Sequence, residues 1–311
     1  MVRLALLALC CTLLFAACST AAETGAREVA ITIDDLPVAS ASDPAERQRA
    51  ITTNLVAKLK RSGAPIVGFV NENKIQDDLP LLEQWLAAGF ELGNHTYSHP
   101  SLHRVDVEEY EHNILRGETK LRPLLTKHGM TLRWFRHPFL HTGTSLETRE
   151  RVSRFLNAHG YRIAPVTFDN SEWIYARAFD LAHAGRDEAL MRRVAEAYVP
   201  YMESKIAYFE DQSQKLFGRN IRHVLLLHAN ALNATTFDEL VAMLRRRGYR
   251  FITLERAVED PAYSSADTHV GRGGISWLHR WARGQGKTRE FFGDEPVVPK
   301  WVMETAKVES E

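Results

Sequence analysis

Short β-rich runs that alternate with helical segments are the feature that most limits the fold of this 311-residue chain. Seven such runs lie near residues 29–33, 65–70, 90–93, 133–136, 161–168, 221–227 and 249–253. Helical periodicity fills the intervals, for example over residues 45–61, 79–88 and 106–127. Strands separated by helices are typical of a parallel sheet. We therefore predict an α/β fold, a distorted (β/α) barrel of about seven parallel strands.

Two segments are longer than a minimal barrel requires. A helical insertion covers about residues 177–218, and Pro200 is expected to divide it into two helices. A C-terminal extension covers residues 259–311, and its Trp277 and Trp281 are four apart and so share a helix face. The pattern predicts one domain over residues 28–258, with the extension packed on the barrel.

The N-terminus has the pattern of an export signal. Arg3 precedes an apolar run over residues 4–17, which is shorter than the roughly 20 residues that span a bilayer. The run ends in small residues before Cys18, so residues 1–18 resemble a lipoprotein signal, and residues 19–27 form a polar tether. An ordinary secretory signal cut nearby, for example after Ala22, is the alternative. Both readings predict an exported protein, and the first predicts a lipid on Cys18 that anchors it to a membrane facing the periplasm.

Composition excludes several classes of protein. The three cysteines are Cys10, Cys11 and Cys18, all in the leader, so no disulfide framework is expected. Lysine plus arginine equals aspartate plus glutamate at 39 each. A chain without a basic excess has no electrostatic attraction for nucleic acid, and we expect no nucleic-acid partner. The sequence leaves the oligomeric state open.

Acidic and imidazole side chains follow two of the predicted strands. Asp34 and Asp35 end the first strand, where an extended backbone aims successive side chains in different directions. His95 and His99 follow the third strand at its carboxyl end, the rim where barrel active sites are built. One carboxylate and two imidazoles suit Zn²⁺, with Co²⁺, Mn²⁺ or Fe²⁺ as alternatives, and leave a position open for water. A turn-forming acidic pair and locally bonded loop histidines are the structural alternative, and His103 is not expected to be a ligand.

Five short motifs in order along the chain carry a resemblance to a known family. They are TIDD at 32–35, HTYSH at 95–99, FRHPF at 135–139, DNSEW at 169–173 and LLH at 226–228. Together they resemble the motifs of the polysaccharide deacetylases that share the NodB homology domain, the carbohydrate esterase family 4 type. The chain departs from the family pattern at Ile33, where phenylalanine is usual, at Leu140, where glycine is common, and at Glu172, which replaces an aspartate.

The resemblance implies a role for each matching residue. Asp35, His95 and His99 would hold the metal ion, and Asp34 would be the general base that takes a proton from the attacking water. His228 would protonate the departing amine, and the backbone N–H of Phe139 would stabilise the oxyanion.

The resemblance also implies a supporting set. Arg136 would pair with Asp34 and orient it, and Asp169 would hold His228 in its protonated form, with Glu172 as the close alternative. Trp173 would offer an apolar wall to the substrate. Arg136, Asp169 and Trp173 are each more often structural residues when they are considered alone.

The predicted function is that of a metal-dependent polysaccharide or oligosaccharide deacetylase, which hydrolyses carbon–nitrogen bonds other than peptide bonds. Its partner would be an N-acetylated glycan. Two alternatives stay open: an amidohydrolase of a linear or cyclic non-sugar amide, since the metal ligands alone do not select the acyl donor, and a glycan-binding lipoprotein without turnover.

Overall fold

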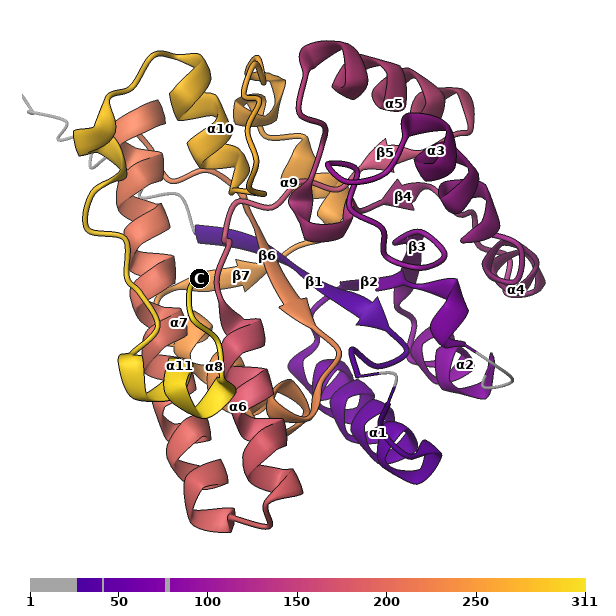
Figure 1. Cartoon of the computed structure of the whole chain (residues 1–311), viewed down its shortest axis with the longest axis vertical. Coiled ribbons are helices and arrows are strands. Elements are labelled where there is room, and N and C mark those ends of the chain that lie inside the picture. Colours follow the sequence, from indigo (N-terminus) through magenta and orange to yellow (C-terminus); the bar gives the residue numbers. More distant parts are fainter. Residues whose placement is uncertain (1–26, 41, 76–78) are drawn as a thin grey trace, which may run out of the picture.

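The computed structural model describes residues 27–40, 42–75 and 79–311, and its centre is a barrel-like parallel sheet (Figure 1). The seven strands are β1 (Arg27–Leu36), β2 (Ile66–Val70), β3 (Glu91–Asn94), β4 (Trp134–Phe135), β5 (Arg162–Ile163), β6 (His223–His228) and β7 (Tyr249–Phe251). The order across the sheet is β5-β4-β3-β2-β1-β6, β7 also pairs with β1, and every pair is parallel. The predicted fold class is therefore confirmed.

The barrel is distorted on the side between β5 and β6. The run at 161–168 forms only the two-residue strand β5, after which the chain crosses to β6. There Phe168 forms an isolated parallel bridge with Leu225, and Thr167 donates its backbone N–H to the Val224 carbonyl. The contact of residues 167 and 168 with β6 replaces the longer strand that would close a complete barrel at this position.

Eleven α-helices surround the sheet in the described part of the chain. They are α1 (Ala45–Ser62), α2 (Leu79–Ala87), α3 (Val107–Arg116), α4 (Leu121–Lys127), α5 (Leu146–Ala158), α6 (Glu172–Ala184), α7 (Glu188–Phe217), α8 (Ala231–Arg246), α9 (Leu254–Val258), α10 (Trp277–Gly284) and α11 (Lys300–Ala306). Figure 1 shows α6, α7, α8 and α11 gathered on one side, and α3, α4 and α5 on the other. None of the helices in the described ranges is long and apolar enough to cross a membrane. The leader with Cys18 lies outside these ranges.

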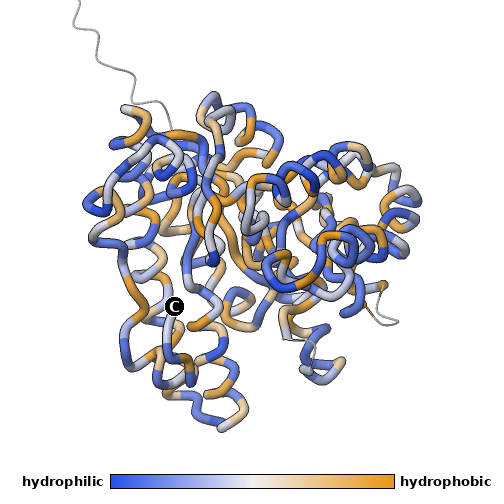
Figure 2. The backbone as a smooth tube through the Cα atoms, turned by 45° about the horizontal axis from the view of Figure 1, so that its top comes forward, coloured by the Kyte–Doolittle hydropathy of each residue, from blue (hydrophilic) through white to orange (hydrophobic). Residues whose placement is uncertain are grey.

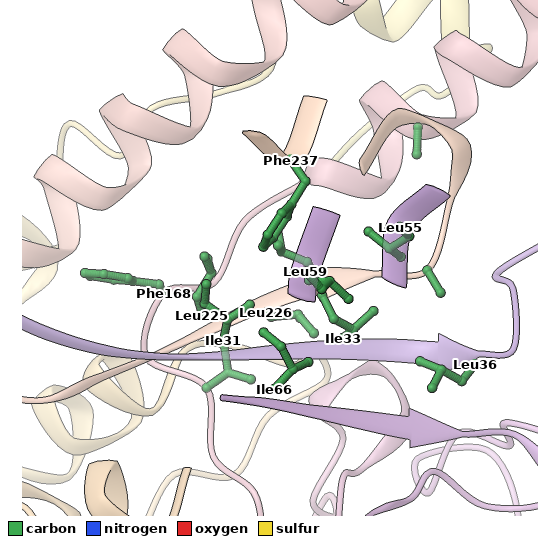
Figure 3. Packing of buried hydrophobic residues seen from close by; sticks show 14 of the residues in the cluster. Ile31, Ile33, Leu36, Leu55, Leu59, Ile66, Phe168, Leu225, Leu226 and Phe237 are labelled. Carbon is green, nitrogen blue, oxygen red and sulfur yellow. The ribbon is translucent and has the colours of Figure 1, made fainter. Parts of the chain in front are cut away.

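The alternation of side chains along β1 divides the interior into two layers. Ile31 and Ile33 belong to the large outer core, where Figure 3 shows Leu59 of α1 and Phe237 of α8 packed over the sheet. Ala30 faces the barrel interior within a smaller cluster of buried side chains, which also includes Val67, Phe69, Trp134, Ala164 and Val224. Figure 2 shows the corresponding pattern of hydrophobic strands at the centre and mixed hydropathy along the helices. Residues in phase with Ala30 therefore point into the barrel.

The helical insertion differs from the prediction at Pro200, which does not divide it. The 30-residue helix α7 runs through Pro200, and the break comes earlier, between α6 and α7, where Arg186 has φ 56° and Asp187 caps the new helix. The prediction was wrong because packing of α7 against its neighbours outweighs the loss of one helical hydrogen bond.

The segment predicted as one helix over 106–127 is interrupted at Gly117. A Cβ atom added to Gly117 would lie 2.6 Å from the carbonyl carbon of Thr96. The chain between α3 and α4 therefore approaches the loop of His95 and His99 so closely that only glycine fits.

The C-terminal extension packs on the barrel through its tryptophans. Trp281 is 1% exposed and lies edge-on to Phe217 at the end of α7, with ring centroids 5.9 Å apart. It also meets Tyr263 of the extension itself, with centroids 5.3 Å apart. Trp277 is also buried, and its backbone N–H donates to the Val166 carbonyl at 2.7 Å. The extension thus covers the gap that follows β5.

Candidate metal and catalytic centre

The alternation of β1 aims Asp34 into the barrel. Asp34 is two residues from Thr32 and four from Ala30, and its side chain is buried beside the guanidinium of Arg136. Arg136 Nη1 lies 3.3 and 3.4 Å from the two carboxylate oxygens. Its Nη2 donates to Thr32 Oγ1 at 3.0 Å, and its Nε donates to the Ala164 carbonyl at 2.9 Å. The fully buried guanidinium is therefore fixed on three sides.

This environment gives Asp34 the character of a base. Burial raises the pKa of Asp34 to about 6, against the opposing attraction of Arg136 and His228. A carboxylate with a pKa near 6 is ionised at neutral pH and accepts a proton more readily than an ordinary aspartate.

Asp35, His95 and His99 form a cluster at the carboxyl ends of β1 and β3. Their ligand atoms all lie within 4.8 Å of one another, and His99 Nε2 is 3.7 Å from Asp35 Oδ1. His95 Nε2 is 3.8 Å from Asp34 Oδ2, which places the metal candidates next to the candidate base. The three predicted ligands are thus brought together.

One hydrogen bond sets the tautomer of His95. Its Nδ1 lies 2.8 Å from the Arg136 carbonyl, which can only accept, so Nδ1 carries the proton and Nε2 is free. Burial and the neighbouring His99 hold the pKa of His95 well below its usual value, and burial also lowers that of His99. Both imidazoles are therefore neutral at pH 7, the form that binds metals.

The backbone at the cluster is in a conformation that non-glycine residues avoid. Asp35 has φ 69°, Thr96 φ 70° and His99 φ 58°. The Thr96 and His99 backbone N–H groups donate to side-chain oxygens, Oδ1 of Asn94 at 2.7 Å and Oγ1 of Thr96 at 3.0 Å. Strained backbone held in place by such bonds is typical of functional sites.

The donor set fits a divalent ion. Asp35 Oδ1 is buried and accepts no well-oriented hydrogen bond from any described residue. Two neutral imidazoles and one carboxylate are a donor set that Zn²⁺ and related ions accept. Asp35 is suited to the charged form, because the ammonium of Lys74 lowers the pKa of Asp35 despite its burial.

Lys74 is a neighbour of the cluster that sequence reasoning missed. Its Nζ lies 3.1 Å from Asp35 Oδ1, the oxygen that faces His99, and its side chain is 14% exposed. Lys74 lies in the short 3₁₀ turn after β2, Glu72–Lys74, which belongs to none of the five motifs. The only signal in the sequence was its place just after a strand end.

His228 lies across the strand pair from Asp34, since β1 and β6 align these two residues. Its Nδ1 donates to Glu172 Oε2 at 2.7 Å. Glu172 is fully buried, and Asn233 Nδ2 donates to its other oxygen at 2.7 Å, as does Asn230. Although burial opposes a charge on His228, the Glu172 carboxylate raises the pKa of His228 to about 9. His228 is therefore protonated at neutral pH and can serve as an acid.

Glu172, rather than Asp169, makes the contact expected to support His228. Asp169 accepts a hydrogen bond from the backbone N–H of Asn170 at 2.9 Å, and burial raises its pKa to about 6, with Lys205 and Arg136 among the nearby cations. The expectation for Asp169 is corrected, because the first turn of α6 brings Glu172 inward under β6.

Phe139 and Trp173 present large apolar side chains to solvent, 53% and 44% exposed. The Phe139 ring meets His99 edge-on, with centroids 4.4 Å apart, so Phe139 borders the metal cluster. Trp173 follows Glu172 at the start of α6. His103 is not part of the cluster of metal candidates; it stacks on His141 with centroids 3.8 Å apart.

Residues 21–164 match the family model described as polysaccharide deacetylase. A peptidoglycan-N-acetylglucosamine deacetylase of Bacillus cereus is 26% identical over 146 residues, which are 47% of this chain and 46% of that protein. The chain therefore spans about half the length of this curated relative. The matched region includes Asp34, Asp35, His95, His99 and Arg136, whereas Glu172 and His228 lie beyond it.

One solved structure shares the fold at a TM-score above 0.5, and a second is similar at a lower score. A mutant of a carbohydrate esterase family 4 pseudoenzyme, described as having restored activity, has a TM-score of 0.51 and 17% identity, and the match covers 76% of this chain and 68% of that one. The peptidoglycan deacetylase PdaC of Bacillus subtilis has a TM-score of 0.46 and 21% identity, covering 76% of this chain and 92% of that one. Because a pseudoenzyme has this fold, activity has to be argued from the site.

Proposed function

We propose that this chain is a metal-dependent hydrolase that removes N-acetyl groups from a carbohydrate, because residues 21–164 match the family model of the polysaccharide deacetylases. The observation that carries the proposal is the convergence of Asp35, His95 and His99 beside a buried Asp34–Arg136 pair. A binding protein without turnover has no need for the base and for a protonated imidazole opposite it.

Asp35, His95 and His99 would hold the ion. A divalent ion in this position supplies Lewis acidity, which lowers the pKa of a bound water and polarises the acetyl carbonyl. Asp34 takes the proton of the attacking water, and Arg136 keeps the Asp34 carboxylate oriented for that transfer. The water oxygen bonds to the acetyl carbon.

His228 completes the reaction on the leaving group. As the carbon–nitrogen bond breaks, the nitrogen needs a proton, because an amide anion is too basic to leave at neutral pH. His228 donates it, and Glu172 stabilises the charge of the imidazolium before the transfer. The products are acetate and a free amine on the sugar. The backbone N–H of Phe139 would stabilise the oxyanion.

The substrate we propose is a glycan with N-acetylglucosamine units, and peptidoglycan is the first candidate because the curated relative is described as acting on it. The exposed ring of Trp173 suits stacking on a sugar face. Such a substrate fits the predicted export, with Cys18 as the proposed site of a lipid anchor and the periplasm as the compartment.

Acetate release tests the proposal. Purified protein loaded with Zn²⁺ is incubated with acetylated chitooligosaccharides and with peptidoglycan, beside the variant Asp34→Asn. We expect acetate from the wild type, and a loss of at least ~100-fold in the variant, the scale on which general bases contribute. Bound metal and bound glycan without acetate from either substrate would instead favour a binding protein.

A further inference from the structure

The C-terminal extension reaches the candidate site through Gly274. A Cβ atom added to Gly274 would lie 1.7 Å from the Phe139 carbonyl oxygen and 2.9 Å from the Leu140 Cβ. No other residue type fits there without displacing the loop of Phe139. Gly274 is 135 positions away along the chain and lies outside the matched family region.

The segment under Gly274 is strained. Phe139 has φ 57° and Leu140 has φ 54°, two consecutive non-glycine residues in the left-handed region. This conformation is unfavourable for a residue with a Cβ atom and persists only where its surroundings hold it. The chain also has leucine where the family often has a glycine that would relax this turn.

The loop that carries Gly274 is itself tied to the barrel on both sides. Before Gly274, the Arg272 carbonyl accepts a hydrogen bond from His103 Nδ1 at 3.1 Å. After it, Ser276 Oγ donates to the Thr167 carbonyl at 2.9 Å, and the Trp277 N–H donates to the Val166 carbonyl. Gly274 therefore lies between two hydrogen-bonded anchors at the point where it contacts Phe139.

We propose that Gly274 is a positioning residue of the active site, and that Gly274, held by the anchors at Arg272 and Ser276, keeps Phe139 and Leu140 in their left-handed conformation. This conformation sets the direction of the Phe139 backbone N–H, so the inference rests on the proposed function of that group as the oxyanion donor. The extension is then part of the catalytic apparatus as well as a cover for the barrel.

The test compares two glycine substitutions that differ by one position. Gly274→Ala places a methyl group against Phe139, whereas Gly273→Ala meets no atom within 4 Å and has no left-handed φ. We expect Gly274→Ala to lower kcat for acetate release by about 100-fold, the scale of a misplaced oxyanion donor, with KM within about 2-fold. Gly273→Ala should match the wild type in both. A purely structural role would lower the melting temperature without changing kcat well below it.

Hydrogen exchange of the segment 137–143, measured by mass spectrometry, gives a readout that does not need activity. Exchange should be faster in Gly274→Ala and unchanged in Gly273→Ala. If the wild type releases no acetate, the proposed function fails, and this contrast still decides whether Gly274 holds the segment. If the wild type is active and the two variants agree in kcat and in exchange, the inference is wrong.

A second pair serves if Gly274→Ala does not fold. His103→Leu removes the donor to the Arg272 carbonyl and also the acceptor of the Gly143 backbone N–H, so exchange is read over residues 137–141 only. His103→Asn keeps an N–H near the position of Nδ1. We expect lower kcat and faster exchange in His103→Leu, with partial recovery in His103→Asn. Equal behaviour of the two would overturn the inference.

Discussion

Glu172 accepts a hydrogen bond from His228 Nδ1 at 2.7 Å, while its other carboxylate oxygen is held by Asn230 and Asn233. The carboxylate is fully buried, so its charge acts on the imidazole with little screening by water. This pair sets the protonation of the group that we propose as the acid.

The first prediction concerns the pH dependence that this pair creates. His228, with its pKa raised to about 9, stays protonated up to that pH, so kcat/KM should decline only as the pH rises through about 9. In Glu172→Gln the imidazolium of His228 loses the attraction of the carboxylate, and burial then lowers the pKa of His228. The decline of kcat/KM on the alkaline side should therefore move to lower pH. At pH 8 we expect kcat/KM of Glu172→Gln to be lower than that of the wild type by about 10-fold or more, since a positioned acid contributes at least this much to such reactions.

Asp169→Asn is the matched control for this prediction, because Asp169 is buried nearby but makes its hydrogen bond to Asn170. Its alkaline limb should stay in place. An equal shift in both variants would contradict the assignment of Glu172.

The second prediction concerns Lys74 and metal affinity. Its ammonium lies 3.1 Å from Asp35 Oδ1 and repels any cation bound there. Lys74→Met should therefore raise the affinity for Zn²⁺ by about 10-fold. This is less than the full repulsion between two charges at that distance in a partly buried site. Chelator competition measures it, with Lys58→Met on the outer helix α1 as the control. Weaker binding in Lys74→Met would show that Lys74 orients Asp35 instead.

The third prediction concerns the buried Arg136–Asp34 pair. Arg136→Met leaves Asp34 buried without its cation, which should raise the pKa of Asp34 and lower the free energy of unfolding by about 3–5 kcal/mol. Arg133→Met, three residues earlier, breaks two partly exposed pairs, with Glu91 and with Glu255, and should cost about 0–1 kcal/mol for each. Urea denaturation compares the two, and equal losses would contradict the structural role given to Arg136.

The fourth prediction concerns substrate binding at Trp173. Removing an aromatic ring that stacks on a sugar should raise KM by about 3–10-fold, corresponding to roughly 0.5–1.5 kcal/mol, and leave kcat and stability nearly unchanged. Leu146→Ala is a control of similar exposure, 45% against 44% for Trp173. Steady-state kinetics on chitooligosaccharides give the result, and an unchanged KM in Trp173→Ala would remove Trp173 from the binding surface.

The places of the seven strands could be predicted because most of them lie in runs of apolar residues bounded by polar ones. The length of β5 could not, since the run at 161–168 forms only the strand Arg162–Ile163. The cluster of Asp35, His95 and His99 could be predicted because parallel strands bring their carboxyl ends to one rim. The choice between Asp169 and Glu172 could not, since it depends on how the first turn of α6 rotates under β6. Likewise, Pro200 stays helical because of packing that no local pattern records.

Contacts between segments that lie far apart in the sequence could not be predicted either. Lys74 reaches Asp35 from a turn after the neighbouring strand, and Gly274 reaches Phe139 from the C-terminal extension. Neither residue belongs to a motif, and their roles follow only from the way the folded chain brings these segments together.

The most direct test is the metal content of the protein after equilibrium dialysis against Zn²⁺, read by elemental analysis for the wild type, His95→Ala, His99→Ala and His103→Ala. The account predicts about one ion per chain in the wild type and in His103→Ala. In His95→Ala and in His99→Ala the affinity for Zn²⁺ should fall by on the order of 100-fold or more, which exceeds the effect of losing a residue that only hydrogen-bonds to a ligand. A wild type that takes up no ion, or a His95→Ala or His99→Ala variant that binds as tightly as the wild type, would contradict it.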